Sequence, residues 1–93
     1  MSARVAVVTG GGSGIGAAAA RELAADGWTV VIAGRRADAL DEVAAGMDRI
    51  DPVPADVTNE AQVRRLFETV VARHRRVDLL FNNAGTSAPA VEL

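Results

Sequence analysis

The sequence predicts an α/β fold with a doubly wound parallel sheet, of which these residues form the first half. Short apolar runs alternate with longer runs of helical spacing. The first two apolar runs lack the polar alternation of a half-exposed strand, which is typical of strands buried on both faces of a parallel sheet. A glycine-rich stretch, T-G-G-G-S-G-I-G at residues 9–16, joins the first apolar run to the first helical run.

The expected elements follow one another as strand, helix, strand, helix, strand, helix and strand. The strands are expected at residues 5–8, 29–33, 50–55 and 77–81, and the helices at residues 15–26, 37–45 and 59–73. The strand at 50–55 is the weakest of the four because Pro52 and Pro54 have no amide to donate to a ladder. We therefore expect this strand to be irregular or to lie near an edge of the sheet.

The helix at 59–73 has the clearest periodicity in the chain. Apolar residues recur at i, i+3, i+4, i+7 and i+8, namely Val63, Leu66, Phe67, Val70 and Val71. Thr58 or Asn59 can cap its start, and Gln62, three residues after Asn59, predicts a reciprocal capping box. A basic cluster at residues 73–76 stands at the expected helix end, where basic side chains are ordinary partners of the helix dipole.

The connections between the strands are long enough for parallel pairing with right-handed crossovers. The expected strand order is 3-2-1-4, which places the topological switch point between the first and fourth strands. The glycine-rich loop and the turn at residues 82–85 then lie at the same edge of the sheet. The topology therefore predicts a ligand crevice over these two turns.

The glycine-rich loop at residues 9–16 is suited to receive a phosphate. Gly10 allows the chain to reverse, Gly14 removes a Cβ so that backbone can approach a pyrophosphate, and Gly16 allows the helix to pack closely. The free amides and positive dipole end of the following helix face the same point. A phosphate-loop NTPase is excluded because its motif requires a lysine and the chain has none. A purely structural glycine turn is the alternative.

Composition and charge exclude several functional classes. The chain has 93 residues, enough for one domain, and its 49% hydrophobic and 24% charged residues are typical of a globular protein. A net charge of −2 gives no general attraction to nucleic acid. The chain has no apolar run of membrane-spanning length, no cysteine and no signal-like segment at its start. We therefore expect a cytoplasmic protein with no nucleic-acid or membrane partner.

Four segments together resemble the short-chain dehydrogenase/reductase family. They are TGGGSGIG at 9–16, AGRR at 33–36, ADVT at 55–58 and NNAG at 82–85, in the order and at about the spacings of the family. The pair of TGxxxGxG and NNAG is far more specific than either motif alone. The resemblance implies a Rossmann-type domain that binds NAD(P), in an oxidoreductase that transfers hydride between the nicotinamide and a small carbonyl or alcohol substrate.

The resemblance also implies cofactor contacts at three places. The glycine loop would hold the pyrophosphate through Gly10, Ser13, Gly14, Ile15 and Gly16. Asp56 would accept a hydrogen bond from the adenine amino group, and Val57 would flank that ring. Asn82, Ala84 and Gly85 would line the adenosine ribose. Considered alone, Asp56 could equally be a helix cap or a solvated acid, and the Asn-Gly turn could simply hold the fourth strand.

The turn after the second expected strand indicates that NADP(H) is preferred to NAD(H). In dinucleotide-binding folds an acidic residue closing this strand binds the ribose 2′-hydroxyl, whereas an arginine accommodates a 2′-phosphate. Gly34 occupies that place and is followed by Arg35 and Arg36. Both arginines could instead be solvated turn residues, and NAD(H) is the alternative cofactor.

The chain departs from the family in its catalytic residues. The family uses a serine, a tyrosine and a lysine, the last two as Y-x-x-x-K, and this chain has no tyrosine and no lysine. We therefore expect residues 1–93 to be a single partial cofactor-binding domain, truncated before the catalytic segment and inactive alone, with no catalytic residue and no metal site. The full-length parent would be a homo-oligomer. A free-standing dinucleotide-binding module without catalysis is the alternative.

Overall fold

The computed structural model describes residues 3–12 and 14–83, and its elements have the predicted types and order. The strands are β1 (Val5–Thr9), β2 (Thr29–Gly34), β3 (Ile50–Pro54) and β4 (Leu79–Asn82). The helices are α1 (Gly14–Ala25), α2 (Ala37–Ala44) and α3 (Glu60–His74). Every boundary lies within one residue of the prediction except the start of β4, which is two residues later.

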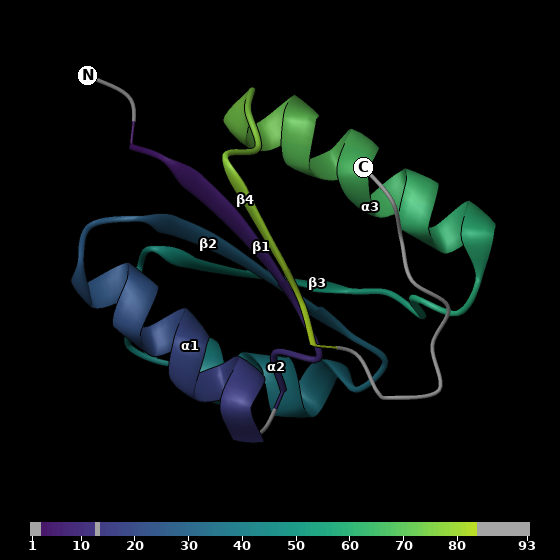
Figure 1. Cartoon of the computed structure of the whole chain (residues 1–93). Coiled ribbons are helices and arrows are strands. Elements are labelled where there is room, and N and C mark those ends of the chain that lie inside the picture. Colours follow the sequence, from purple (N-terminus) through teal and green to yellow (C-terminus); the bar gives the residue numbers. More distant parts are fainter. Residues whose placement is uncertain (1–2, 13, 84–93) are drawn as a thin grey trace.

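The four strands form one parallel sheet in the order β3-β2-β1-β4, as the sequence predicts (Figure 1). β1 is central and pairs with β2 from Val5 opposite Thr29. The proline-containing strand β3 lies at an edge, where Pro52 and Pro54 remove fewer ladder hydrogen bonds than they would in a central strand. The predicted α/β class, the Rossmann-type topology and the strand order are therefore confirmed.

Helices α1 and α2 cover one face of the sheet, and α3 covers the other (Figure 1). Successive side chains of a strand point to opposite faces, so each inner strand contributes to both layers. In β2, Val30 and Ile32 belong to the core beneath α1 and α2, whereas Val31 and Ala33 belong to the core beneath α3. Every residue of β1 is buried. This two-sided burial explains why the first two apolar runs have no polar alternation.

The start of α3 confirms Asn59 as the cap but shows that the predicted capping box is wrong. Asn59 Oδ1 accepts a hydrogen bond from the Gln62 amide at 3.1 Å. The Asn59 amide already donates to the Asp56 carbonyl at 3.0 Å. The Gln62 side chain therefore bonds elsewhere, and its Oε1 accepts from the Asp56 amide at 2.7 Å.

The basic cluster at residues 73–76 is tied to acidic side chains at the strands. Arg73 Nη1 donates to the two Asp51 oxygens at 2.9 and 3.1 Å, and His74 Nε2 lies 2.9 Å from Asp51 Oδ2. Arg76 donates two hydrogen bonds of 2.7 Å to Asp78. The Asp51 contacts fix the C-terminal end of α3 to the edge strand β3, and the Arg76–Asp78 contact lies within the segment that connects α3 to β4.

The late start of β4 has a side-chain cause. Asp78 Oδ2 accepts a hydrogen bond from the Val5 amide at 2.8 Å, where a ladder carbonyl would otherwise stand. The Asp78 amide donates to the Val5 carbonyl at 2.8 Å. The chain is thus already held against β1 at Asp78, and regular pairing begins one residue later, at Leu79.

Candidate functional site

The loops that follow the four strands meet at one edge of the sheet (Figure 1). All strands are parallel, so their carboxyl ends point the same way, and ligands of such sheets bind outside these ends near the switch point. β1 leads into the glycine loop, β2 into Arg35, β3 into the Asp56 turn and β4 into Asn83. The fold thus brings the described candidate residues to the same end of the sheet.

Thr9, the last residue of β1, joins the glycine loop to the end of β4. Its side chain donates a hydrogen bond to Asn82 Oδ1 at 2.9 Å and accepts one from the Asn83 amide at 2.9 Å. Thr9 is only 6% exposed. The Asn82 side chain, which was expected beside a ribose, therefore also joins the ends of β1 and β4 at the switch point.

Two glycines of the loop are required by close packing. A Cβ on Gly16 would overlap the Gly10 carbonyl oxygen and would lie 2.9 Å from Asn83 Nδ2. A Cβ on Gly11 would lie 2.7 Å from the Cβ of Ile32 in β2. The loop consequently lies directly against the sheet and against the end of β4.

Gly10 and Gly14 place the backbone of the loop in the left-handed region. Their φ angles are 67° and 59°, which residues with a Cβ rarely adopt. A Cβ on Gly14 would meet nothing within 4 Å, so this residue borders open space. α1 starts at Gly14 and has no acidic residue in its first turn. Its free amides and positive dipole end are therefore not offset by a carboxylate of the same turn.

A cavity of about 450 Å³ lies beside the glycine loop and the start of α2. It is lined by the loop, the end of β2 and α2, through Gly10, Gly12, Gly34, Arg35, Arg36, Asp38, Ala39, Leu40 and Glu42. The loop and the arginine pair, which the sequence singled out separately, thus share one cavity. Asp56, Val57 and Asn82 lie outside its lining.

Asp56 stands in the turn between β3 and α3, and its carboxylate is partly engaged. Asp56 Oδ1 accepts hydrogen bonds from the Thr58 amide at 3.0 Å and from Thr58 Oγ1 at 2.6 Å. The Thr58 hydrogen bonds and, to a smaller extent, the charge of Arg35 lower the pKa of Asp56 below its usual range. Asp56 is therefore an ionised acceptor at neutral pH, close enough to Arg35 for the two charges to interact. Its neighbour Val57 is half-buried.

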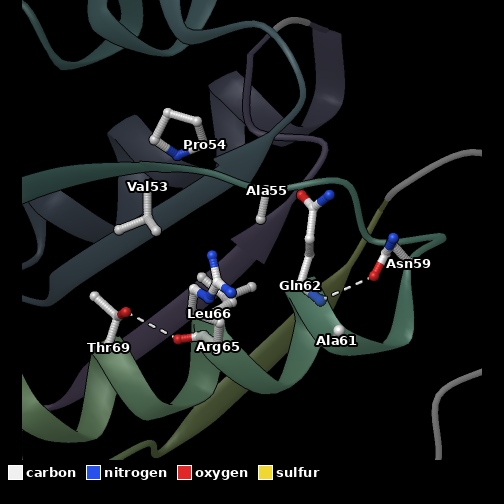
Figure 2. A pocket seen from close by; sticks show the side chains of 9 residues that line it. All are labelled: Val53, Pro54, Ala55, Asn59, Ala61, Gln62, Arg65, Leu66 and Thr69. Carbon is white, nitrogen blue, oxygen red and sulfur yellow. Dashed lines mark hydrogen bonds between the residues drawn. The ribbon is translucent and has the colours of Figure 1, made fainter.

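A second cavity, of about 310 Å³, lies between β3 and α3 (Figure 2). Three polar side chains around it, those of Asn59, Gln62 and Thr69, bond to backbone groups. Asn59 caps the Gln62 amide, and Thr69 Oγ1 donates to the Arg65 carbonyl at 2.8 Å. This cavity therefore reflects how α3 packs on β3. Its contribution to the candidate site is indirect, because the Gln62 side chain holds the amide of Asp56.

Four further candidate residues complete the comparison with the sequence. Ser13, Ala84 and Gly85 lie outside the described residues, so their roles stay predictions. Ile15 lies in the first turn of α1 and is 71% exposed. Across residues 3–12 and 14–83, no helix is long and apolar enough to cross a membrane, and no three His, Cys, Asp or Glu residues are grouped to hold a metal ion.

Sequence reasoning missed three residues that shape the site. Gly11 packs on a strand residue 21 positions away, which a local pattern does not reveal. Gln62 supports the Asp56 turn rather than closing a capping box. Asp38 lines the arginine cavity and accepts a hydrogen bond from Arg36. The R-x-D spacing was the available signal for this last contact.

A family model, that of the short chain dehydrogenase, matches residues 4–93. The chain belongs to the short-chain dehydrogenase family. One relative is the short-chain dehydrogenase/reductase VdtF of Byssochlamys spectabilis, which is 41% identical over 91 residues. That match covers 96% of this chain and 30% of VdtF. The recognition of the family from its four sequence segments is therefore confirmed.

Solved structures of the family show the same fold. A single-residue variant of actinorhodin polyketide ketoreductase, solved with NADPH, superposes with a TM-score of 0.85 at 34% identity, over 91% of this chain and 35% of that one. The 3-ketoacyl-(acyl-carrier-protein) reductase of Brucella melitensis, solved with NADH, gives a TM-score of 0.81 at 35% identity, over 85% and 33% of the two chains. The chain thus spans about a third of the length of these short-chain dehydrogenases.

Proposed function

We propose that residues 1–93 form the NADP(H)-binding part of an oxidoreductase that transfers hydride between the nicotinamide and a carbonyl or alcohol substrate. The cavity shared by the glycine loop and the arginine pair carries this proposal. Membership of the short-chain dehydrogenase family supports the reaction class. Two relatives were solved with a nicotinamide dinucleotide, one with NADPH and one with NADH, so the choice between the two rests on this chain's own residues.

The backbone of the glycine loop fits a pyrophosphate. Gly14 borders open space on the side where a Cβ would stand, so a ligand can approach the main chain there. The N-terminal amides of the 12-residue helix α1 follow directly and favour a negative group. Gly10, Gly14, Ile15 and Gly16 would therefore hold the pyrophosphate. A pyrophosphate placed at this point leaves the adenosine half directed toward the ends of β2 and β3.

The residues at the ends of β2 and β3 suit the adenosine half of NADP(H). Gly34 stands where an acidic residue would bind a 2′-hydroxyl and repel a 2′-phosphate. Arg35 and Arg36 follow it and line the cavity, so their guanidinium groups would bind the 2′-phosphate by charge-assisted hydrogen bonds. Asp56 and Val57 in the next loop would contact the adenine.

The bound nicotinamide would supply or accept the hydride. The 93 residues would bind and orient the dinucleotide, but carbonyl reduction also requires a proton donor. The chain has no tyrosine and no lysine for that role. We therefore assign proton transfer to a segment outside these residues, in keeping with the 30% and 35% of its relatives' length that the chain spans.

Titration of both reduced cofactors tests the proposed preference. We expect Arg35→Ala to weaken NADPH binding about 10- to 100-fold, because a charge-assisted hydrogen bond is lost. NADH binding should change less than about twofold, since NADH has no 2′-phosphate. Arg21→Ala on α1 removes an exposed arginine outside the cavity and serves as the control. Equal losses of NADPH and NADH affinity would mean that the arginines do not recognise the 2′-phosphate.

A dinucleotide-binding module without catalysis is the second candidate function, favoured by the absence of tyrosine and lysine. The two functions differ in turnover. The chain of 93 residues alone should bind NADPH without oxidising it in the presence of a carbonyl substrate under either function. A longer protein that carries these residues should oxidise NADPH only under the first, and a failure to do so with any carbonyl would favour the binding module.

A further inference from the structure

The cavity beside the glycine loop is lined by an acidic side chain that is bonded to one of the two arginines. Arg36 Nη2 donates a hydrogen bond to Asp38 Oδ2 at 3.1 Å, and both residues line the cavity. The lining also includes Arg35 and Glu42, so its formal side-chain charges, two positive and two negative, sum to zero. The cavity therefore has no net positive charge with which to attract a phosphate. Its preference for NADP(H) or NAD(H) depends on which groups the two guanidiniums bind.

The local fold explains why Arg36 and Asp38 meet. Arg36 is the N-cap residue of α2, with an extended backbone at φ −100° and ψ 101°, and its side chain makes no capping bond. Asp38 lies in the first turn of α2, where the positive end of the helix dipole favours a carboxylate. The two side chains, two residues apart, form an ion pair at the start of α2.

We propose that Asp38 is a specificity-determining residue that competes with the 2′-phosphate of NADP(H) for Arg36 and so limits the preference for NADP(H) over NAD(H). This inference rests on the proposed function. In the protein without cofactor, the Arg36 guanidinium is held by Asp38. Binding of a 2′-phosphate would draw Arg36 away from Asp38, so the ion pair would have to break before Arg36 could bind the phosphate.

The size of the effect follows from the exposure of the pair. The Arg36 and Asp38 side chains are 77% and 74% exposed, so solvent screens their attraction and the ion pair is weak. A doubly charged phosphate can therefore replace Asp38 as the partner of Arg36. Breaking the ion pair still lowers the affinity for NADPH. We expect Asp38→Asn to strengthen NADPH binding about 2- to 5-fold, the effect of removing one exposed ion pair. NADH has no 2′-phosphate, so its affinity should stay within about twofold.

The ratio of NADPH to NADH affinity is the measured quantity, obtained by titration with the fluorescence of the reduced nicotinamide. Both cofactors meet the same population of folded protein, so the ratio does not depend on the fraction that is folded. Asp41→Asn is the matched control, because it removes the same charge from α2 at an exposed position outside the cavity lining. The ratio should rise in Asp38→Asn and stay unchanged in Asp41→Asn.

A double variant separates competition from simple repulsion. In an Arg36→Ala background the ion pair no longer exists, so Asp38→Asn should raise NADPH affinity by less than about twofold. An unchanged ratio in Asp38→Asn would overturn the proposal. The proposal would also be overturned if the ratio rose only because NADH binding weakened. Asp38 would then be an acceptor for the 2′-hydroxyl of NADH.

The same set of variants tests the proposed function independently. If Arg35→Ala and Arg36→Ala leave NADPH binding unchanged, the arginine pair does not recognise the 2′-phosphate and the proposed function fails. If Arg36→Ala weakens NADPH binding but Asp38→Asn has no effect on the ratio, the proposed function holds and only the role of Asp38 is overturned.

Discussion

Thr9 and Asn82 join the first and last strands of the sheet at the point where the strand order reverses. Thr9 Oγ1 donates to Asn82 Oδ1 at 2.9 Å, and the same oxygen accepts from the Asn83 amide at 2.9 Å. Asn83 Nδ2 in turn lies against Gly16, so the hydroxyl fixes the end of β4 beside the start of α1. One buried hydroxyl thus links both turns that the family motifs identify.

Removing the Thr9 hydroxyl should release the end of β4. Thr9→Val keeps the shape but leaves the Asn83 amide without its acceptor, which should cost about 1–3 kcal/mol of unfolding free energy. Hydrogen exchange at the Asn83 amide should accelerate by more than the global loss of stability explains. Thr9→Ser keeps the hydroxyl, so exchange at this amide should follow the global stability alone. Retained protection of the Asn83 amide in Thr9→Val would contradict the assigned role of the hydroxyl.

The fold was predictable because its signals are local. The buried run that became β1 has no polar alternation, and Asn59 directly precedes the helix that it caps. The features that were missed depend on distant partners. The start of β4 is shifted by the Asp78 carboxylate, which bonds to Val5 across the sheet. The packing of Gly11 on β2 depends in the same way on a residue remote in sequence.

The sequence predicted from topology that the glycine loop and the turn at residues 82–85 lie together, and the structure supplies the relation of the loop to the arginine pair. The glycine loop and Arg35 were identified from sequence, but only the structure shows that they line one cavity. From the sequence, Asp56 could equally be a helix cap or a ligand-binding residue. The structure shows that Asp56 Oδ1 accepts hydrogen bonds from the Thr58 amide and side chain. The ion pair of Arg36 and Asp38 was missed because charges at this spacing near a helix start are most often solvated.

The contact between Asp78 and Arg76 should make stability depend on pH in the acid range. The Arg76 hydrogen bonds, followed by the Val5 amide, lower the pKa of Asp78 below its usual range. A depressed pKa in the folded state means that the stabilisation is complete above the unfolded value of about 3.9 and is lost as the pH falls through the folded value.

Asp78→Asn should therefore lower stability at pH 7 and flatten the loss of stability below about pH 4. Arg76→Gln removes the largest cause of the shift but keeps the Val5 amide, so it should flatten the acid slope only in part. Urea unfolding of the three proteins measures how the unfolding free energy changes with pH. The range from about pH 2.5 to 7 extends on both sides of the usual aspartate pKa of about 3.9. An acid slope in Asp78→Asn as steep as that of the unchanged chain would contradict this account.

The free side of β4 should cause the chain of 93 residues to self-associate. Within the described part of the chain, β4 pairs only with β1, and Leu79 is 39% exposed beside Leu80, Phe81 and Leu23. An apolar strand with a free edge is a template for further pairing. Sedimentation velocity should therefore show concentration-dependent species larger than a monomer.

A charge on β4 should reduce this association. Leu79→Lys places a cation near Glu22 and Asp26, which line the same cavity of about 400 Å³. Val71→Lys is the control, because Val71 on α3 is also an exposed apolar residue, at 53%. Leu79→Lys should shift the distribution toward monomer and Val71→Lys should not. A monomeric unchanged chain at all concentrations would refute the role of the edge.

Gly14 and Gly46 allow the ligand-binding role of the glycine loop to be separated from its conformational role. Both have positive φ, 59° and 74°, and a Cβ on either would meet nothing within 4 Å. Each alanine substitution should thus cost about 1–2 kcal/mol of stability through backbone strain alone.

Gly46 follows α2 at the opposite end of that helix from Arg36, whereas Gly14 starts α1 where a pyrophosphate would approach. Only Gly14→Ala should therefore weaken cofactor binding beyond the change in folded fraction. It should weaken NADPH and NADH equally, because both carry the pyrophosphate. Calorimetric stability and parallel titrations with both cofactors measure the two effects, and equal cofactor affinity in Gly14→Ala and Gly46→Ala would show that the loop does not hold the pyrophosphate at Gly14.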